Sequence, residues 1–212
     1  MPDRNFDIDF DYEPLTGFAS AFEEAAERWE GVIVADLPNV QEVDDLLVKV
    51  RVIPIDGEGG TLGQAGPTRF RKEGGLPYMG VMEFDAADVA SIAAGGTLPS
   101  VVMHEMAHVL GLGALWSRRK FDFIDFDNAG YTGENALAEY RTLTGNPAAS
   151  VVPLETTGGR GTVYSHWAEA IFGDELMTGY ADDDLPLSRV TVGALEDLGY
   201  TVRYAAADPF AL

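Results

Sequence analysis

An apolar stretch from Val101 to Gly113, which carries His104, Glu105 and His108, constrains the fold of this chain more than any other segment. Aliphatic residues and methionine fill most of its other positions, which predicts a helix buried on most sides. Residues four apart on a helix lie one above the other, so both imidazoles can reach one metal ion. Polar groups are costly on a buried helix unless they bind something, and we interpret them as a metal site.

Glu105 and His166 complete the candidate chemistry. Glu105 follows the first histidine and can reach a water molecule on the metal, where it would act as general base. The chain has three histidines, and the remaining one is His166. A catalytic zinc ion usually takes three protein ligands and keeps a position for water, so His166 as third ligand would use every histidine. The competing interpretation is that His104 and His108 are core histidines and that the motif is a coincidence.

Length and charge limit the alternatives. The 212 residues are enough for one domain with a sizeable core, or for two small lobes around a cleft. The net charge of −21 would repel a phosphate backbone, so we expect no nucleic-acid partner. It favours cationic ligands, Ca2+ included, although a solvated acidic surface is the simpler explanation. Cysteine is absent, which excludes disulfides and thiolate ligands. We find no apolar run that could span a membrane and no signal-peptide pattern.

Hydrophobic periodicity predicts mixed helices and strands. Alternation over Phe6–Tyr12 and β-branched residues over Leu46–Ile55 predict strands. Between them, we expect a helix introduced by Pro14 and Thr16 that runs to about Trp29. The glycine-rich segment Asp56–Gly66 is interpreted as a loop, with a further strand over Thr68–Arg71.

Turn and cap residues predict where the later helices begin and end. Asp85 is expected to cap a brief helix through Ile92, and Pro99 or Ser100 to open the histidine helix, which ends at Gly111. Thr132 is expected to cap a helix over Gly133–Leu143, and Ser188 one that runs to Leu198. The Asp125 segment lacks the oxygen ligands of an EF-hand, and the acidic run Asp182–Asp184 is interpreted as surface, with Ca2+ binding as the minority interpretation.

The spacing of the histidines carries a family resemblance. His104-Glu-x-x-His108-x-x-Gly111 resembles the zinc motif of the metzincins. Most metzincins have their third histidine three residues after the glycine, where this chain has Ala114. The leishmanolysins instead place a long insertion there. Ser165-His166-Trp167 and the following segment to Gly179 resemble their third ligand and Met-turn, and Thr132–Leu137 resembles part of their insertion.

The resemblance implies an α+β, metzincin-like zinc peptidase as a single catalytic domain over residues 1–212. It implies an N-terminal lobe, about 1–113, with a twisted mixed sheet plus helices, a mostly irregular C-terminal lobe, about 114–212, and a cleft between them. His104, His108 and His166 would bind one catalytic Zn2+, Glu105 would be the general base, and Met177 would form the turn beneath the metal. The absence of cysteine is more typical of a compact bacterial relative than of the disulfide-rich protozoan enzymes.

The expected function is that of a zinc-dependent endopeptidase that cleaves proteins or peptides with a zinc-activated water. We expect a secreted monomer. Tyr180 is a candidate for contact with the oxyanion or the substrate, although a purely packing role for this tyrosine explains its position at least as well. The strand Gly80-Val81-Met82-Glu83-Phe84, just before the histidine helix, is our candidate for the edge that pairs with substrate. The alternatives are a zinc-binding pseudo-peptidase or inhibitor-binding protein without turnover, a zinc hydrolase of other amides, and a purely structural zinc site.

Overall fold

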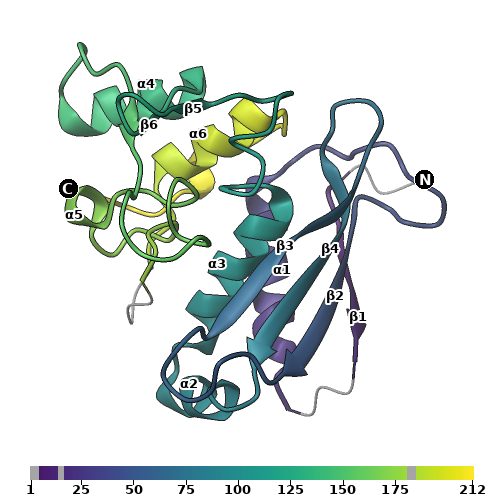
Figure 1. The fold of residues 1–212 in the computed structure, drawn as a ribbon. Coiled ribbons are helices and arrows are strands. Elements are labelled where there is room, and N and C mark those ends of the chain that lie inside the picture. Colours follow the sequence, from purple (N-terminus) through teal and green to yellow (C-terminus); the bar gives the residue numbers. More distant parts are fainter. Residues whose placement is uncertain (1–4, 14–16, 181–184) are drawn as a thin grey trace. The chain divides into compact units, whose positions relative to one another are not determined.

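The computed structural model describes residues 5–13, 17–180 and 185–212 (Figure 1). The chain forms two compact units, one ending at Gly111 and the other beginning at Leu112, and each is described by itself. Helices and strands occur in both, which confirms the α+β fold class. No helix in the described part of the chain is long and apolar enough to cross a membrane. Two predicted features, the helix start at Pro14 and Thr16 and the acidic run Asp182–Asp184, lie outside the described residues.

A four-stranded sheet with the order β1-β2-β4-β3 forms the base of the first unit. Its strands are β1 (Ile8–Tyr12), β2 (Leu46–Ile53), β3 (Gly63–Phe70) and β4 (Pro77–Asp85). β1, β2 and β4 run parallel to one another, whereas β3 runs antiparallel along β4. The sheet therefore has its edges at β1 and β3, and β4 is paired on both sides.

Two helices cover one face of this sheet, α1 (Ala19–Val32) and α3 (Leu98–Leu110) (Figure 1). The indole N–H of Trp29 on α1 donates a hydrogen bond of 3.2 Å to the carbonyl oxygen of Met103 on α3. Trp29 is fully buried, so this bond satisfies a polar group in the core. The two helices are thus joined by both packing and a buried hydrogen bond.

The covered face of β4 fits the helices through small and aromatic residues. Phe84 meets Phe22 of α1 edge-on, with ring centroids 5.4 Å apart. At Gly80, four residues earlier on β4, α3 approaches very closely. A Cβ added at Gly80 would stand 2.3 Å from Val109 Cγ1. A side chain of any size at position 80 would push α3 away from the sheet.

Helix α3 begins and ends as the sequence predicts. Pro99 lies in its first turn, where the missing N–H has no intrahelical partner. Gly111 ends the helix with a left-handed φ of 112°, which favours glycine. From Val101 to Gly113 only His104 and His108 are partly exposed, and all other residues are buried. The apolar positions therefore anchor the helix, while the two histidines face out of the core.

Two local predictions in this unit are wrong. The glycine-rich segment was predicted as a loop to Gly66, but β3 already begins at Gly63, because pairing with β4 overrides the weak strand propensity of glycine. Asp85 does not cap the brief helix α2 (Val89–Gly95), which Asp88 precedes. The Asp85 carboxylate instead accepts hydrogen bonds from backbone N–H groups in the loop 55–57.

The second unit combines short elements with many turns. A three-stranded sheet has the order β5-β6-β7. Its elements are β5 (Ile124–Asp125), β6 (Gly130–Tyr131), α4 (Glu134–Thr144), β7 (Val152–Pro153), α5 (Glu169–Phe172), α6 (Arg189–Leu198) and the 3-10 helix η1 (Tyr204–Ala206). Helices α4 and α6 pack against each other.

The caps of these two helices show one success and one error of prediction. Ser188 caps α6 as predicted, with its Oγ accepting from the Thr191 N–H. Thr132 does not cap α4, because its hydroxyl donates to the Phe123 carbonyl instead. Asp197 of α6 takes that role, accepting from the N–H groups of Asn135 and Ala136 at 2.8 and 3.1 Å. The cap of α4 is therefore a tertiary contact from Asp197, whereas the sequence predicted Thr132, which lies next to the helix in the chain.

Candidate metal centre

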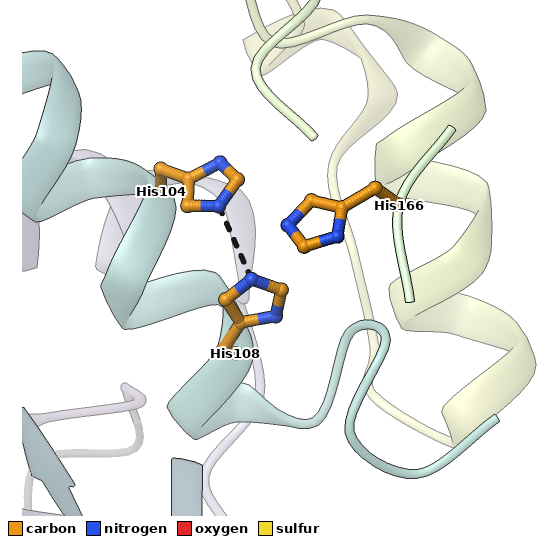
Figure 2. A group of neighbouring side chains, drawn as sticks. All are labelled: His104, His108 and His166. Atoms are coloured by element: carbon orange, nitrogen blue, oxygen red, sulfur yellow. Dashed lines mark hydrogen bonds between the residues drawn. The ribbon is translucent and has the colours of Figure 1, made fainter. Parts of the chain in front are cut away.

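His104 and His108 lie one turn apart on the partly exposed face of α3. Their Nε2 atoms are 3.1 Å apart, and the two rings stand nearly perpendicular, at 85° (Figure 2). Two nitrogen ligands at about 2.05 Å from a tetrahedral zinc ion would be about 3.3 Å apart. The pair therefore already has the spacing of two ligands to one metal ion.

Glu105 lies on a different side of the same helix and reaches toward β3. Its side chain is only 7% exposed. A Cβ added at Gly63, the first residue of β3, would stand 3.2 Å from Glu105 Oε1. Burial raises the pKa of Glu105 to about 8, as expected for a carboxyl group removed from water. A divalent cation on the neighbouring histidines would favour the ionised carboxylate.

His166 belongs to the second unit and is held in one orientation. Its Nδ1 lies 3.1 Å from the carbonyl oxygen of Thr162 and 2.9 Å from Ser165 Oγ. Because a carbonyl oxygen only accepts, Nδ1 carries the proton and Nε2 keeps the lone pair that a metal requires. The ring is drawn with the other two histidines in Figure 2, and each of the three offers one ring nitrogen suited to a metal.

The backbone around His166 is also tied down. The Glu155 N–H donates to the His166 carbonyl at 2.9 Å, and the Tyr164 N–H donates to the Glu155 carbonyl at 2.8 Å. The Glu155 side chain accepts from the N–H groups of Thr156 and Thr157. The segment that presents His166 is therefore fixed at several points.

Met177 lies in a buried turn directly beside the His166 segment. Its side chain is fully buried, and its carbonyl oxygen accepts from the N–H of Trp167 at 2.9 Å. Two residues on, a Cβ added at Gly179 would stand 3.9 Å from His166 Cγ. The predicted Met-turn segment is thus packed against the third histidine within the same unit.

Glu175, which sequence reasoning did not single out, anchors this turn. Its carboxylate is completely buried and accepts from the N–H groups of Met177 at 2.6 Å and Ser188 at 3.0 Å. It also accepts from the Thr191 hydroxyl. Burial raises the pKa of this carboxyl group, and these hydrogen bonds oppose the rise. Glu175 therefore connects the Met177 turn to the beginning of α6.

The candidate substrate strand Gly80-Val81-Met82-Glu83-Phe84 is wrong as an edge. These residues belong to β4, which pairs with β2 on one side and β3 on the other, so its backbone groups have no open side. The edge next to Glu105 is β3, and chain order alone did not reveal that β3 folds back outside β4. Tyr180 is 53% exposed, and its contact with oxyanion or substrate stays a prediction.

The acidic residues that the structure describes do not support a calcium site. Carboxylate oxygens of Asp36, Asp44 and Asp45 form a group of suitable size. Both oxygens of Asp45 already accept from backbone N–H groups, those of Asp7 and Leu37. Burial raises the pKa of Asp45 to about 6. The Asp45 carboxylate is therefore explained by the hydrogen bonds of the folded chain, and the group does not carry a calcium assignment.

Known proteins resemble this chain over most of its length. The family model described as leishmanolysin, peptidase family M8, matches residues 38–211. A leishmanolysin of Leishmania donovani is 30% identical over 164 residues, which cover 74% of this chain and 27% of the relative. A leishmanolysin-like peptidase of Drosophila melanogaster is 40% identical over 57 residues, 26% of this chain and 8% of the relative.

This chain belongs to the leishmanolysin family of metallopeptidases. The match spans about a quarter of the Leishmania relatives, with 27% of the L. donovani protein and 26% of the L. chagasi protein covered. The resemblance noted from the histidine spacing is thereby confirmed at the level of the family.

Proposed function

We propose that this chain is a zinc-dependent endopeptidase. The observation that carries the proposal is the pair His104 and His108 on α3, with Nε2 atoms 3.1 Å apart and the buried carboxylate of Glu105 between them in sequence. Membership of a metallopeptidase family gives this arrangement its chemical context. Histidines that only filled the core would be expected at buried positions. His104 and His108 instead occupy the partly exposed positions of an otherwise buried helix.

We assign His166 as the third ligand, with His104 and His108. The Nδ1 contacts that leave the Nε2 lone pair for a metal support this role. Ala114 occupies the position where most metzincins carry their third histidine, so another residue must supply it. Met177 then packs in the turn beside the third ligand, as the family resemblance implies.

Glu105 would take a proton from the attacking water and later donate it to the leaving amine. When bound, Zn2+ would lower the pKa of water toward neutrality and polarise the scissile carbonyl. An amide in place of the Glu105 carboxylate could not accept this proton, so the variant Glu105→Gln would lack the general base.

The substrate would add a strand to the open edge of β3. This assignment replaces the original one to β4. β3 is the outermost strand on its side among the described residues, none of its residues is fully buried, and Gly63 lies against Glu105. An extended peptide paired with this edge would pass the general base. The substrate would be a protein or peptide, and the resemblance further favours a secreted location.

Metal content and casein cleavage, measured on the wild type and Glu105→Gln, test this function. We expect one zinc per chain in both proteins, and a loss of cleavage of at least about 100-fold in the variant. Zinc in both with no cleavage by the wild type would favour the zinc-binding pseudo-peptidase. Folded wild type that takes up no zinc would refute the metal site.

A further inference from the structure

The hydrogen-bonding phase of β3 determines which of its groups face the open edge. The Asp85 N–H donates to the Leu62 carbonyl at 3.0 Å, so this opposed pair is of the hydrogen-bonded type. From there the register is regular: Gly63 lies opposite Phe84, and the pairing continues residue by residue until Pro67 lies opposite Gly80. Hydrogen-bonded and non-hydrogen-bonded pairs alternate in an antiparallel ladder. Gly63, Ala65 and Pro67 therefore turn their backbone groups away from β4.

These residues do not offer the same groups to a paired peptide. Gly63 and Ala65 each present an N–H donor and a carbonyl acceptor. Pro67 presents only its carbonyl, because its ring replaces the N–H. Beyond Pro67 the regular register is interrupted, with irregularities between Pro67 and Arg69 and between Arg69 and Phe70. The regular open edge thus begins at Gly63 and loses its donor at Pro67.

The beginning of this edge coincides with the general base. A Cβ at Gly63 would stand 3.2 Å from Glu105 Oε1, so the ladder starts beside the candidate catalytic carboxylate. At about 3.3 Å per residue, Pro67 lies about 13 Å further along the strand. A substrate paired from Gly63 onward would thus have a defined length of backbone recognition on one side of the cleaved bond.

We propose that Pro67 is a specificity-determining residue that limits the length of the substrate ladder. This proposal rests on the endopeptidase function above. It means that the enzyme binds the backbone of about five substrate residues along β3. Residues added to the substrate beyond that point gain no hydrogen bond from this edge. Pro67 would then keep recognition short and local to the cleaved bond.

The test uses internally quenched peptides that share one cleavage sequence and lengthen residue by residue on either side. Wild type, Pro67→Ala and the control Thr68→Ala are compared, since Thr68 is an exposed neighbour that already has its N–H. For the wild type, kcat/KM should rise with length on one side and then level off. In Pro67→Ala the rise should continue, with kcat/KM for the longest peptide about fivefold above wild type and the shortest peptide unchanged.

Two results would overturn the proposal. One is the same length dependence in Pro67→Ala as in wild type, with cleavage intact, which leaves the endopeptidase function standing. The other is self-association of Pro67→Ala in size-exclusion chromatography without any change in cleavage, which would make Pro67 a protector of the edge.

A wild type that cleaves none of the peptides would refute the endopeptidase function separately. Affinity of the longest peptide for wild type and Pro67→Ala, measured by fluorescence anisotropy, would then test the ladder alone. Equal affinities would refute the role of Pro67, and tighter binding by Pro67→Ala would support it.

Discussion

The carboxylate of Glu105 lies against the backbone of Gly63, so closely that a Cβ at position 63 would stand 3.2 Å from Oε1 and 3.3 Å from Cγ of Glu105. This contact joins the helix that carries the histidines to the strand at the sheet edge. It means that the proposed general base and the proposed substrate strand are positioned by the same unit of the fold.

Replacing Gly63 with alanine should therefore impair catalysis more than folding. The added methyl group would displace the Glu105 carboxylate, and small displacements of catalytic groups are costly, so we expect kcat/KM for casein peptides to fall about tenfold or more. Gly66→Ala is the matched control on the same strand, because a Cβ there meets nothing within 4 Å. Both variants should bind zinc equally. Equal activity of the two would show that the Gly63 contact is not needed.

Ser165 should strengthen zinc binding without touching the metal. Its Oγ lies 2.9 Å from His166 Nδ1 and helps to hold the ring and its tautomer. We expect Ser165→Ala to lower zinc affinity about tenfold, the lower end of such effects, because the Thr162 carbonyl remains. Competition with a chelator would measure the affinity. The exposed Ser150→Ala serves as control, and an unchanged affinity in Ser165→Ala would contradict this role.

Gly80 should be required for the packing of α3 on the sheet. A Cβ at position 80 would stand 2.3 Å from Val109 Cγ1, so we expect Gly80→Ala to lower the free energy of unfolding by about 1–3 kcal/mol. Val109→Ala removes the obstructing methyl groups. In urea unfolding, the double variant should lose less stability than the sum of the two single variants. Strict additivity would mean that the clash is relieved elsewhere.

Asp85 should give the protein a pH-dependent contribution to stability. Hydrogen bonds from backbone N–H groups hold the pKa of Asp85 below its ordinary value. The N–H of Ala87 contributes most, followed by those of Gly57, Asp56 and Ile55. Its ionised form therefore stabilises the folded state above the unfolded pKa, and this stabilisation is lost as pH falls through the folded pKa.

We accordingly expect Asp85→Asn to lower Tm at pH 7, and the difference from wild type to shrink as the solution is acidified toward the folded pKa. Thermal unfolding across pH would measure both. Glu58→Gln, an exposed carboxylate in the same loop region, should leave Tm nearly unchanged at every pH. A difference between Asp85→Asn and wild type that grows on acidification would contradict the assigned sign.

The sequence by itself determined what depends on short chain distances. The four-residue spacing of His104 and His108, Pro99 at the start of α3 and Gly111 at its end are local features, because a helix is made of contacts between near neighbours. For the same reason Ser188 was recognised as a cap from its position alone. The family resemblance followed from this local pattern and from the segment around His166.

Only the tertiary structure decided which strand forms the edge, what caps α4 and what holds the Met177 turn. β4 was taken for the edge because it precedes α3 in the chain, yet β3 folds back along its open side. Asp197 caps α4 from more than 60 residues away, at a separation of 62 from Asn135. Such pairings join groups that are distant in sequence, and no local periodicity encodes them. Gly63 likewise acquired its place beside Glu105 only when the sheet and the helix packed together.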